Sequence, residues 1–248
     1  MKRRILGSGL VLLFIFSLWV ATRTESSEVV EVWKITSLNW EPYSSAEMTN
    51  QGNAVQALRE LLKAHGVELQ VEYYPWSRAR KVARGAGYVG YFPAWPNEVD
   101  PGFLASEPVL YSHLAVLSTP ATPVVLNSLE SIVSQYRTGY VSTYDYPDYI
   151  RSTLDKHPAN TRQTMTDLLL LKMLVGQRFD VAIADPLVIE YLAEKHGLQE
   201  AQVVLELEHE PLVLAFRDEP ANKARLERLN KMLRAANSPS GGVGQAPH

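Results

Sequence analysis

A strand–helix–strand pattern constrains the fold of this chain more than any other feature of its sequence. Apolar and polar residues alternate over 67–74, as in a β-strand, and Pro75 ends that strand. A short helix is expected over 78–84, capped by Ser77, and the apolar run 88–92 predicts a second strand. A strand, a helix and a strand at this spacing form a βαβ unit. Such units build parallel sheets that are flanked by helices, so the sequence predicts an α/β fold.

Both strands of this unit end in aromatic residues that have polar neighbours. The first strand leads into Tyr74-Pro75-Trp76-Ser77-Arg78, and the second into Phe92-Pro93-Ala94-Trp95. Open α/β sheets bind ligands in the crevice outside the carboxyl ends of their strands, and rings with a few polar groups are typical of small-molecule sites. We therefore expect Trp76, Arg78, Phe92 and Trp95 to contact a ligand. The alternative is that the rings belong to the core and that Arg78 is solvated.

Composition and motifs exclude several classes of function. The net charge is -3 with no basic run outside the N-terminus, so no nucleic-acid partner is predicted. The chain has no cysteine, and its six histidines show no metal-ligand spacing, so neither a metal nor a cofactor is expected. Residues 85–90 fit the G-x-G-x-x-G pattern of dinucleotide sites. However, a helix precedes this pattern and a strand follows it, the reverse of what that site needs, so we interpret it as a turn.

The N-terminus predicts export. Lys2, Arg3 and Arg4 precede an apolar run over 5–20, as in a secretory signal peptide. Trp19 occupies a position where a cleavage site prefers small residues, so residues 1–21 are interpreted as either a signal peptide or a membrane anchor. The expected location is the periplasm, with attachment to the membrane through this segment as the alternative.

The βα rhythm occurs twice, on either side of the segment 118–123, which is rich in proline and threonine. This repetition predicts two α/β lobes, each with a small and mostly parallel sheet, joined by two chain crossings that form a hinge. The predicted division is 29–118 for the first part of lobe one, 119–206 for lobe two, 207–237 for the return to lobe one, and 238–248 for a disordered tail. Predicted strands and helices outside the opening unit are 30–38, 53–65, 109–117, 128–136, 138–141, 147–157, 167–175, 181–184, 186–196, 211–216 and 221–235.

Several short pieces of sequence, taken in their order and spacing, carry a family resemblance. The chain resembles the bacterial extracellular solute-binding proteins of family 3, two-lobed periplasmic receptors best known for binding amino acids. The resemblance extends over about residues 30–235 and implies a type II periplasmic-binding-protein fold. The pieces that carry it include Trp40-Glu41-Pro42-Tyr43, Pro75-Trp76-Ser77-Arg78-Ala79, Phe103-Leu104-Ala105-Ser106-Glu107-Pro108 and Phe179-Asp180-Val181-Ala182-Ile183-Ala184-Asp185.

The resemblance also implies roles for particular residues. An aromatic residue after the first strand stacks on the ligand in this family, which implies Trp40 or Tyr43. An acidic residue after a short strand of lobe two takes the ligand's ammonium group, which implies Asp185. A loop of lobe two offers backbone N–H groups to a carboxylate, which implies Thr143 and Tyr144. Asp185 also precedes a proline at a predicted helix start, where it would be a good N-cap in any protein.

One family feature is missing from the sequence. The family's arginine that clamps the ligand carboxylate lies a few residues before the Ser-Glu-Pro segment, and the count leads to Val99. Arg78 and Arg80 are the candidates to replace it. The glycine usual in the loop of lobe two is replaced by Thr143, with Asp145 close by, which makes that loop less favourable for an anion. The identity of the ligand therefore stays open.

The predicted function is capture of a small polar or amino-acid-like ligand between the lobes, without bond chemistry. We expect a monomer that delivers its ligand to a membrane ABC importer or signals to a sensor. One alternative is an enzyme on the same scaffold, since a few relatives of this fold are carboxylic-acid dehydratases. In that case Glu41, Asp185 or Arg78 would act as acid, base or clamp. Another alternative is a sensor lobe anchored in the membrane.

Overall fold

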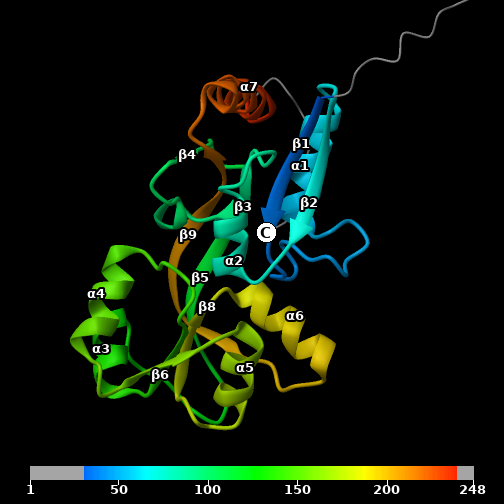
Figure 1. Ribbon diagram of the computed structural model, residues 1–248. Coiled ribbons are helices and arrows are strands. Elements are labelled where there is room, and N and C mark those ends of the chain that lie inside the picture. Colours follow the sequence, from blue (N-terminus) through cyan, green and yellow to red (C-terminus); the bar gives the residue numbers. More distant parts are fainter. Residues whose placement is uncertain (1–30, 239–248) are drawn as a thin grey trace, which may run out of the picture.

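A computed structural model describes residues 31–238 of the chain as two α/β lobes, one above the other (Figure 1). The predicted signal peptide or anchor, and all but the first residue of the predicted tail, lie outside the described residues. Within residues 31–238, no helix has the length and apolarity needed to cross a bilayer.

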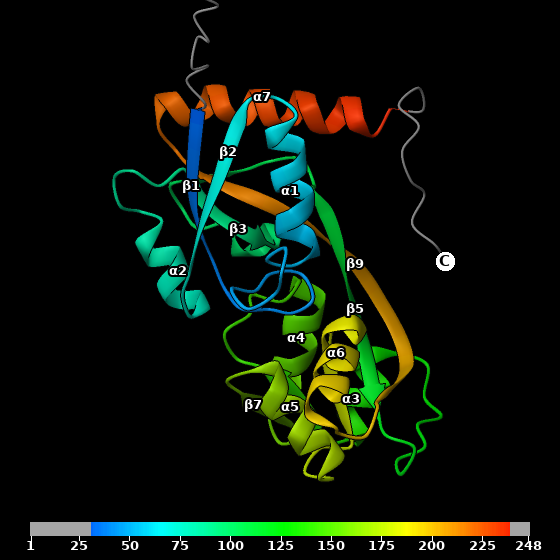
Figure 2. The same cartoon turned by 90° about the vertical axis from the view of Figure 1, so that its right-hand side faces the viewer.

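Lobe one contains the predicted βαβ unit. Its sheet has the order β2-β1-β3-β9, with β4 also paired to β9. Strand β1 runs parallel to β2 and β3, whereas β9 is antiparallel to β3. Helix α7 lies across the end of this lobe that is remote from lobe two (Figure 2). The elements are β1 (Glu31–Ser37), α1 (Asn53–Lys63), β2 (Val67–Tyr73), α2 (Trp76–Val82), β3 (Gly90–Ala94), the 3₁₀ helix η1 (Pro96–Glu98), β4 (Phe103–Ala105), the end of β9 (Gln202–Arg217) and α7 (Pro220–Ala236).

Lobe two continues the sheet in the order β5-β8-β6-β7. Strand β6 is parallel to β7 and β8, and β5 is antiparallel to β8. Strand β7 was not predicted, because its sequence Thr-Arg-Gln-Thr has no apolar alternation and it lies at the edge of the sheet. The elements are β5 (Leu110–Ser118), α3 (Leu129–Gln135), β6 (Thr138–Val141), α4 (Asp148–Lys156), β7 (Thr161–Thr164), α5 (Asp167–Val175), β8 (Val181–Ala184) and α6 (Pro186–His196).

The two lobes share the long antiparallel pair β5 and β9, which passes from one lobe to the other (Figure 2). In β5, residues 115–118 already pair with β8 of lobe two. This pairing supports the proposal that the chain enters lobe two before the segment 118–123, where the sequence predicts the crossing. The pairing of β5 with β9 shifts register between His113 and Ala115, which marks the change of lobe. We propose that the chain crosses between the lobes near residues 113 and 207. Lobe two would then extend from about residue 113 to about residue 207.

The predicted N-termini of α3, α5 and α6 are confirmed by side-chain capping bonds. Ser128 accepts a hydrogen bond from the backbone N–H of Ser131, and Thr166 accepts one from that of Leu169. Gly197 ends α6 with a left-handed φ of 61°, a conformation that glycine adopts readily. Helix α2 differs from the prediction. It begins at Trp76, so Ser77 lies inside its first turn and is not the cap.

Strand β3 also differs from its prediction. It includes Pro93, which was expected to follow the strand, and its pairing with β9 is irregular between Tyr91 and Ala94. Proline has no N–H to donate, so a break in the ladder is where a strand tolerates it. All five residues of β3 are buried, which makes this strand the centre of lobe one and brings its end to the boundary with lobe two.

Candidate functional site

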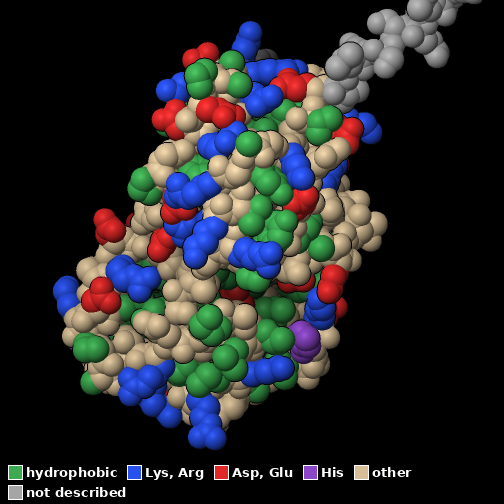
Figure 3. All heavy atoms as spheres, in the orientation of Figure 1, with side chains coloured by type: hydrophobic (Ala, Val, Ile, Leu, Met, Phe, Trp, Pro, Cys, Tyr) green, Lys and Arg blue, Asp and Glu red, His purple; other side chains and the backbone are tan. Residues whose placement is uncertain are grey.

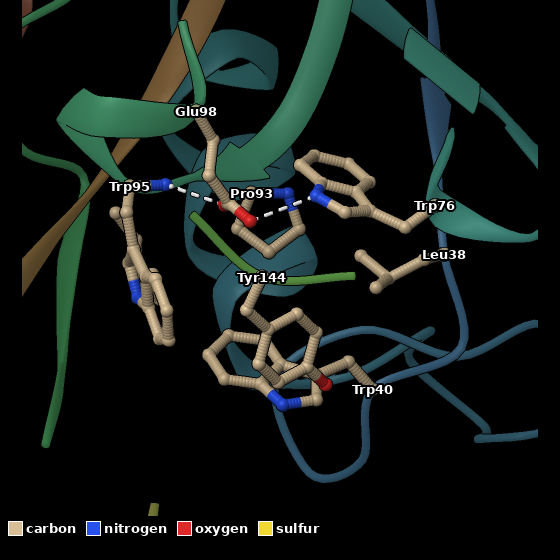
Figure 4. A pocket seen from close by; sticks show the side chains of 8 residues that line it. Leu38, Trp40, Trp76, Pro93, Trp95, Glu98 and Tyr144 are labelled. Atoms are coloured by element: carbon tan, nitrogen blue, oxygen red, sulfur yellow. Dashed lines mark hydrogen bonds between the residues drawn. The ribbon is translucent and has the colours of Figure 1, made fainter. Parts of the chain in front are cut away.

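The strand exits of lobe one meet lobe two at one small cavity (Figure 4). Trp40 follows β1, Trp76 begins α2, and Trp95 follows β3, so three separate exits each bring an indole to the same place. From lobe two, Tyr144 extends between these rings (Figure 4). The cavity has a volume of about 10 Å³, room for about one water molecule. Its other lining residues are Leu38, Pro93, Glu98 and Leu212.

Rings from both lobes contact one another directly and fill the cleft. The rings of Trp40 and Tyr43 stack with centroids 4.5 Å apart. Across the lobe boundary, the Tyr144 ring lies 5.5 Å from that of Trp95 and 6.4 Å from that of Trp40, in edge-to-face arrangements. The Tyr146 ring of lobe two lies 5.9 Å from that of Trp95. The lobes are therefore closed on each other, and four of the predicted aromatic residues, Trp40, Tyr43, Trp95 and Tyr144, are brought together.

Glu98 is a buried carboxyl in the wall of this cavity that the sequence analysis did not single out. Its Oε1 accepts the indole N–H of Trp76 at 2.8 Å, and its Oε2 accepts the backbone N–H of Trp95 at 3.0 Å (Figure 4). Burial raises the pKa of Glu98 to about 7, although these two hydrogen bonds act in the opposite direction. The site therefore contains a carboxyl that can hold or release a proton near neutral pH.

Asp185 is fully occupied by bonds within the protein. Its Oδ1 accepts the backbone N–H groups of Leu187 and Val188 and so caps α6. Its Oδ2 accepts the Tyr43 hydroxyl at 2.9 Å and the backbone N–H of His113 at 2.8 Å. The residue is 3% exposed, and burial raises its pKa against these hydrogen bonds. The Tyr43–Asp185 bond joins the two lobes at the position that was predicted to hold the ligand's ammonium group.

Besides Asp185, the predicted site residues Tyr43, Arg78, Phe92 and Thr143 do not line the small cavity. Phe92 is fully buried in β3 and lines none of the three cavities found between or beside the lobes. Arg78 is exposed on α2, with its guanidinium 5.2 Å from the centre of the Tyr74 ring.

Arg80, the other candidate to replace the family's clamp, is already paired with carboxylates. It pairs with Asp100 of its own lobe and, at 2.8 Å, with Asp145 of lobe two. This guanidinium therefore ties the lobes together instead of pointing at a free position in the cleft.

A much larger cavity, of about 780 Å³, opens between the lobes beside α2. Figure 3 shows a hollow at the boundary of the lobes, with Lys and Arg side chains gathered on its upper lip over α2. Thr143 and Tyr144, which were predicted to contact the ligand, line the opposite side, and Trp76 lines the lobe-one side. The remaining lining residues are Leu38, Asn39, Tyr73, Tyr74, Pro75, Ser77, Arg78, Lys81, Met165, Thr166 and Asp167.

Asp167, the first residue of α5, lies in the wall of this cavity and of a second one of about 280 Å³. It is 8% exposed and accepts a hydrogen bond from the Tyr144 hydroxyl. Burial raises its pKa to about 6, and the bond from Tyr144 opposes that shift. The sequence analysis missed this residue, because an acidic residue in the first turn of a helix is explained by the helix dipole alone.

The part of the chain that the structure describes contains no group of three or more His, Cys, Asp or Glu residues that could hold a metal ion.

Comparisons with known proteins identify the fold and nothing finer. No family model matches the sequence, and no curated protein matches it. A histidine kinase sensor domain with similarity to periplasmic binding proteins matches with a TM-score of 0.69 at 15% identity, over 83% of this chain and 90% of that chain. An ancestral arginine-binding protein bound to arginine matches with a TM-score of 0.67 at 14% identity, over 85% and 94%. A periplasmic binding protein of an arginine transport system from Legionella pneumophila matches with a TM-score of 0.64 at 13% identity, over 85% and 95%.

The predicted architecture is confirmed at the level of the fold. This chain has the mixed α/β, two-lobed fold of the type II periplasmic binding proteins, a fold that amino-acid-binding proteins and sensor domains share.

Proposed function

We propose that this chain is an exported solute-binding protein that captures a small polar or amino-acid-like ligand between its lobes. The observation that carries the proposal is the 780 Å³ cavity at the lobe boundary. One lip carries Arg78 and Lys81 of lobe one, the other carries Asp167 of lobe two, and Trp76 and Tyr144 supply aromatic walls. Ligand sites of this size combine apolar walls with a few polar groups that fix orientation.

Opening of the lobes would admit a ligand, and return to the closed arrangement would enclose it. The lobes are joined by β5 and β9, and two adjacent crossings of this kind permit hinge motion. A ligand shifts the protein toward the closed state only by as much as it binds that state better than the open one. A ligand that contacts both lips of the cavity has that preference, because the lips belong to different lobes.

The downstream partner is proposed to be a membrane protein, either an ABC importer or a receptor with a sensing role. The comparison proteins include a component of an arginine transport system and a sensor domain, so the fold serves both uses. We propose a periplasmic monomer. It would be free in the periplasm if the predicted signal segment 1–21 is cleaved, and attached to the membrane if that segment is kept.

A thermal-shift screen of amino acids, polyamines and small carboxylates tests the function. A binding protein raises its melting temperature with at least one of them, and the ligand is recovered unchanged when the complex is denatured and analysed by mass spectrometry. Recovery of a dehydrated or decarboxylated product would support the alternative of an enzyme on this scaffold. No stabilisation by any compound of these classes would contradict the proposed function.

A further inference from the structure

We propose that Asp167 receives the cationic group of the ligand in place of Asp185, and that Arg78 and Lys81 receive its anionic group. The ligand class is therefore a small zwitterion, with an amine and a carboxylate far enough apart to contact both lips of the 780 Å³ cavity. This inference rests on the proposed function, and it names the residues and the chemistry of the same cleft.

Asp185 has no acceptor position left for a ligand. A carboxylate offers about four lone-pair positions, and Asp185 uses four, for one hydroxyl and three backbone N–H groups. A ligand ammonium would have to displace Tyr43 or uncap α6. Asp185 is also absent from the linings of all three cavities.

Asp167, in contrast, has acceptor positions left for a ligand. The N-cap of α5 is Thr166, whose hydroxyl accepts the backbone N–H of Leu169, so the Asp167 carboxylate is not needed as a cap. Its one side-chain partner among the described residues is the Tyr144 hydroxyl. No lysine or arginine in residues 31–238 forms an ion pair with it, although it is 8% exposed and lies in the walls of two cavities. A buried carboxylate without a cation is unfavourable, and a ligand cation at this position would offset that cost.

The aromatic rings around Asp167 also favour a bound cation. Tyr144 directs its hydroxyl to Asp167 while its ring packs against those of Trp40 and Trp95. An ammonium group bound at Asp167 would therefore lie beside an aromatic cluster, and aromatic faces attract cations.

The opposite lip carries positive charge that the protein does not neutralise. Arg80 and Arg84 of the same segment both pair with Asp100. Arg78 and Lys81 line the cavity and, within the described part of the chain, have no carboxylate partner. The lining of the cavity thus includes two cations of lobe one without a carboxylate partner and one buried carboxylate of lobe two without a cation, which is the charge pattern complementary to a zwitterion.

Isothermal titration calorimetry with four probes tests the ligand class. L-lysine and 5-aminopentanoate carry both charges, putrescine carries only positive charge, and glutarate carries only negative charge. We expect at least one of the two zwitterionic probes to bind more tightly than putrescine and glutarate. Tighter binding of putrescine or glutarate would overturn the zwitterion inference and leave the proposed function standing. If none of the four binds and the wider screen also fails, both proposals are wrong.

Substitutions test the residue assignment with the tighter zwitterionic probe. Asp167→Asn should weaken its binding at least tenfold, and the double variant Arg78→Ala/Lys81→Ala should do the same. The matched control is Asp148→Asn, which changes an exposed acidic residue at the same first position of α4 and should leave affinity within twofold. Unchanged affinity in Asp167→Asn together with lost binding in Asp185→Asn would return the role to Asp185 and overturn the inference.

A measurement on the unsubstituted protein covers the case in which Asp167→Asn does not fold. The Asp167 carboxyl can be titrated by carbon-13 NMR with and without the bound probe. A cation at this carboxylate should lower its pKa, because it stabilises the ionised form. An unchanged Asp167 pKa in the complex would overturn the inference.

Discussion

Glu98 and Asp185 are both buried carboxyls at the lobe boundary, but they differ in how completely hydrogen bonds surround them. Asp185 accepts bonds from four donors, whereas Glu98 accepts two, from Trp76 and from the backbone of Trp95. Burial raises the pKa of Glu98 to about 7, compared with an ordinary value of 4.5, and it raises the pKa of Asp185 as well, against twice as many hydrogen bonds. The protonation state of Glu98 therefore makes the stability of the protein depend on pH.

Glu98 should make the protein less stable as pH rises toward neutrality. Between pH 4.5 and about 7 the folded protein holds a proton on Glu98 that the unfolded chain has lost, so the free energy of unfolding falls as pH rises through this window. The contribution is about 1–3 kcal/mol, present in full below pH 4.5 and lost above about 7. Glu98→Gln removes it, so the loss of stability between pH 4.5 and 7.5 should be smaller in the variant.

Urea unfolding at the two pH values measures this difference. Glu190→Gln, which changes an exposed residue of α6, is the control and should lose as much stability as the unsubstituted protein. Gln supplies one acceptor oxygen for two N–H donors, so Glu98→Gln should also be less stable at pH 4.5, by about 1–3 kcal/mol. Equal pH dependence in Glu98→Gln and in the unsubstituted protein would contradict the assignment.

The sequence indicated part of the site for physical reasons that apply to single residues. Trp40, Trp76 and Trp95 follow strand ends beside prolines, and the exits of neighbouring strands converge at one edge of a sheet. Phe92 could not be separated from them, because β3 is buried on both faces and its sequence does not distinguish the face toward the cleft. Asp167 could not be found either, because the helix dipole explains an acidic residue at a helix start, and its contact with Tyr144 joins positions 23 residues apart in the sequence.

At the scale of elements, local signals predicted the helices well and the edges of the sheet poorly. Caps such as Thr166, and stops such as Gly197, act within one turn of the chain, so they can be recognised without tertiary structure. Strand β7 and the polar half of β9 form only because a neighbouring strand supplies hydrogen-bond partners. The predicted strand 211–216 omits the acidic run 206–210 for this reason, although that run pairs with β5.

Gly90 is the residue on which the β3–β9 pairing depends most directly. A Cβ atom added there would lie 1.8 Å from the backbone oxygen of Ala215 in β9, and a backbone atom cannot move aside as a side chain does. Gly90→Ala should therefore destabilise the protein by about 2–3 kcal/mol or more, measured by urea unfolding. Gly85→Ala is the matched control, since its Cβ would come no closer than 3.1 Å to another atom. A loss in Gly90→Ala no larger than in this control would show that β3 and β9 can separate at little cost.

At the scale of the molecule, a few weak contacts hold the lobes closed. The Tyr43–Asp185 hydrogen bond is buried and contributes about 0.5–1.5 kcal/mol, a typical net value for such a bond. The partly exposed Arg80–Asp145 pair contributes about 0–1 kcal/mol. Lys195, 3.5 Å from both Glu41 and Glu47, adds a contact of the same weak kind. A ligand of ordinary affinity has enough binding energy to change a balance of this size.

Removal of two of these contacts should open the cleft in a measurable fraction of molecules. The combined loss of about 1–2 kcal/mol in Tyr43→Phe/Asp145→Asn multiplies the ratio of open to closed molecules by about 5–30. The chain has no cysteine, so Lys63→Cys on lobe one and Lys172→Cys on lobe two allow a spin label at each of two exposed sites and nowhere else. Double electron–electron resonance should then show a second, longer distance in the variant. A single distance identical to that of the labelled parent would mean that the packing of Tyr144 against the tryptophans of lobe one holds the cleft shut, and that the two polar contacts follow closure instead of causing it.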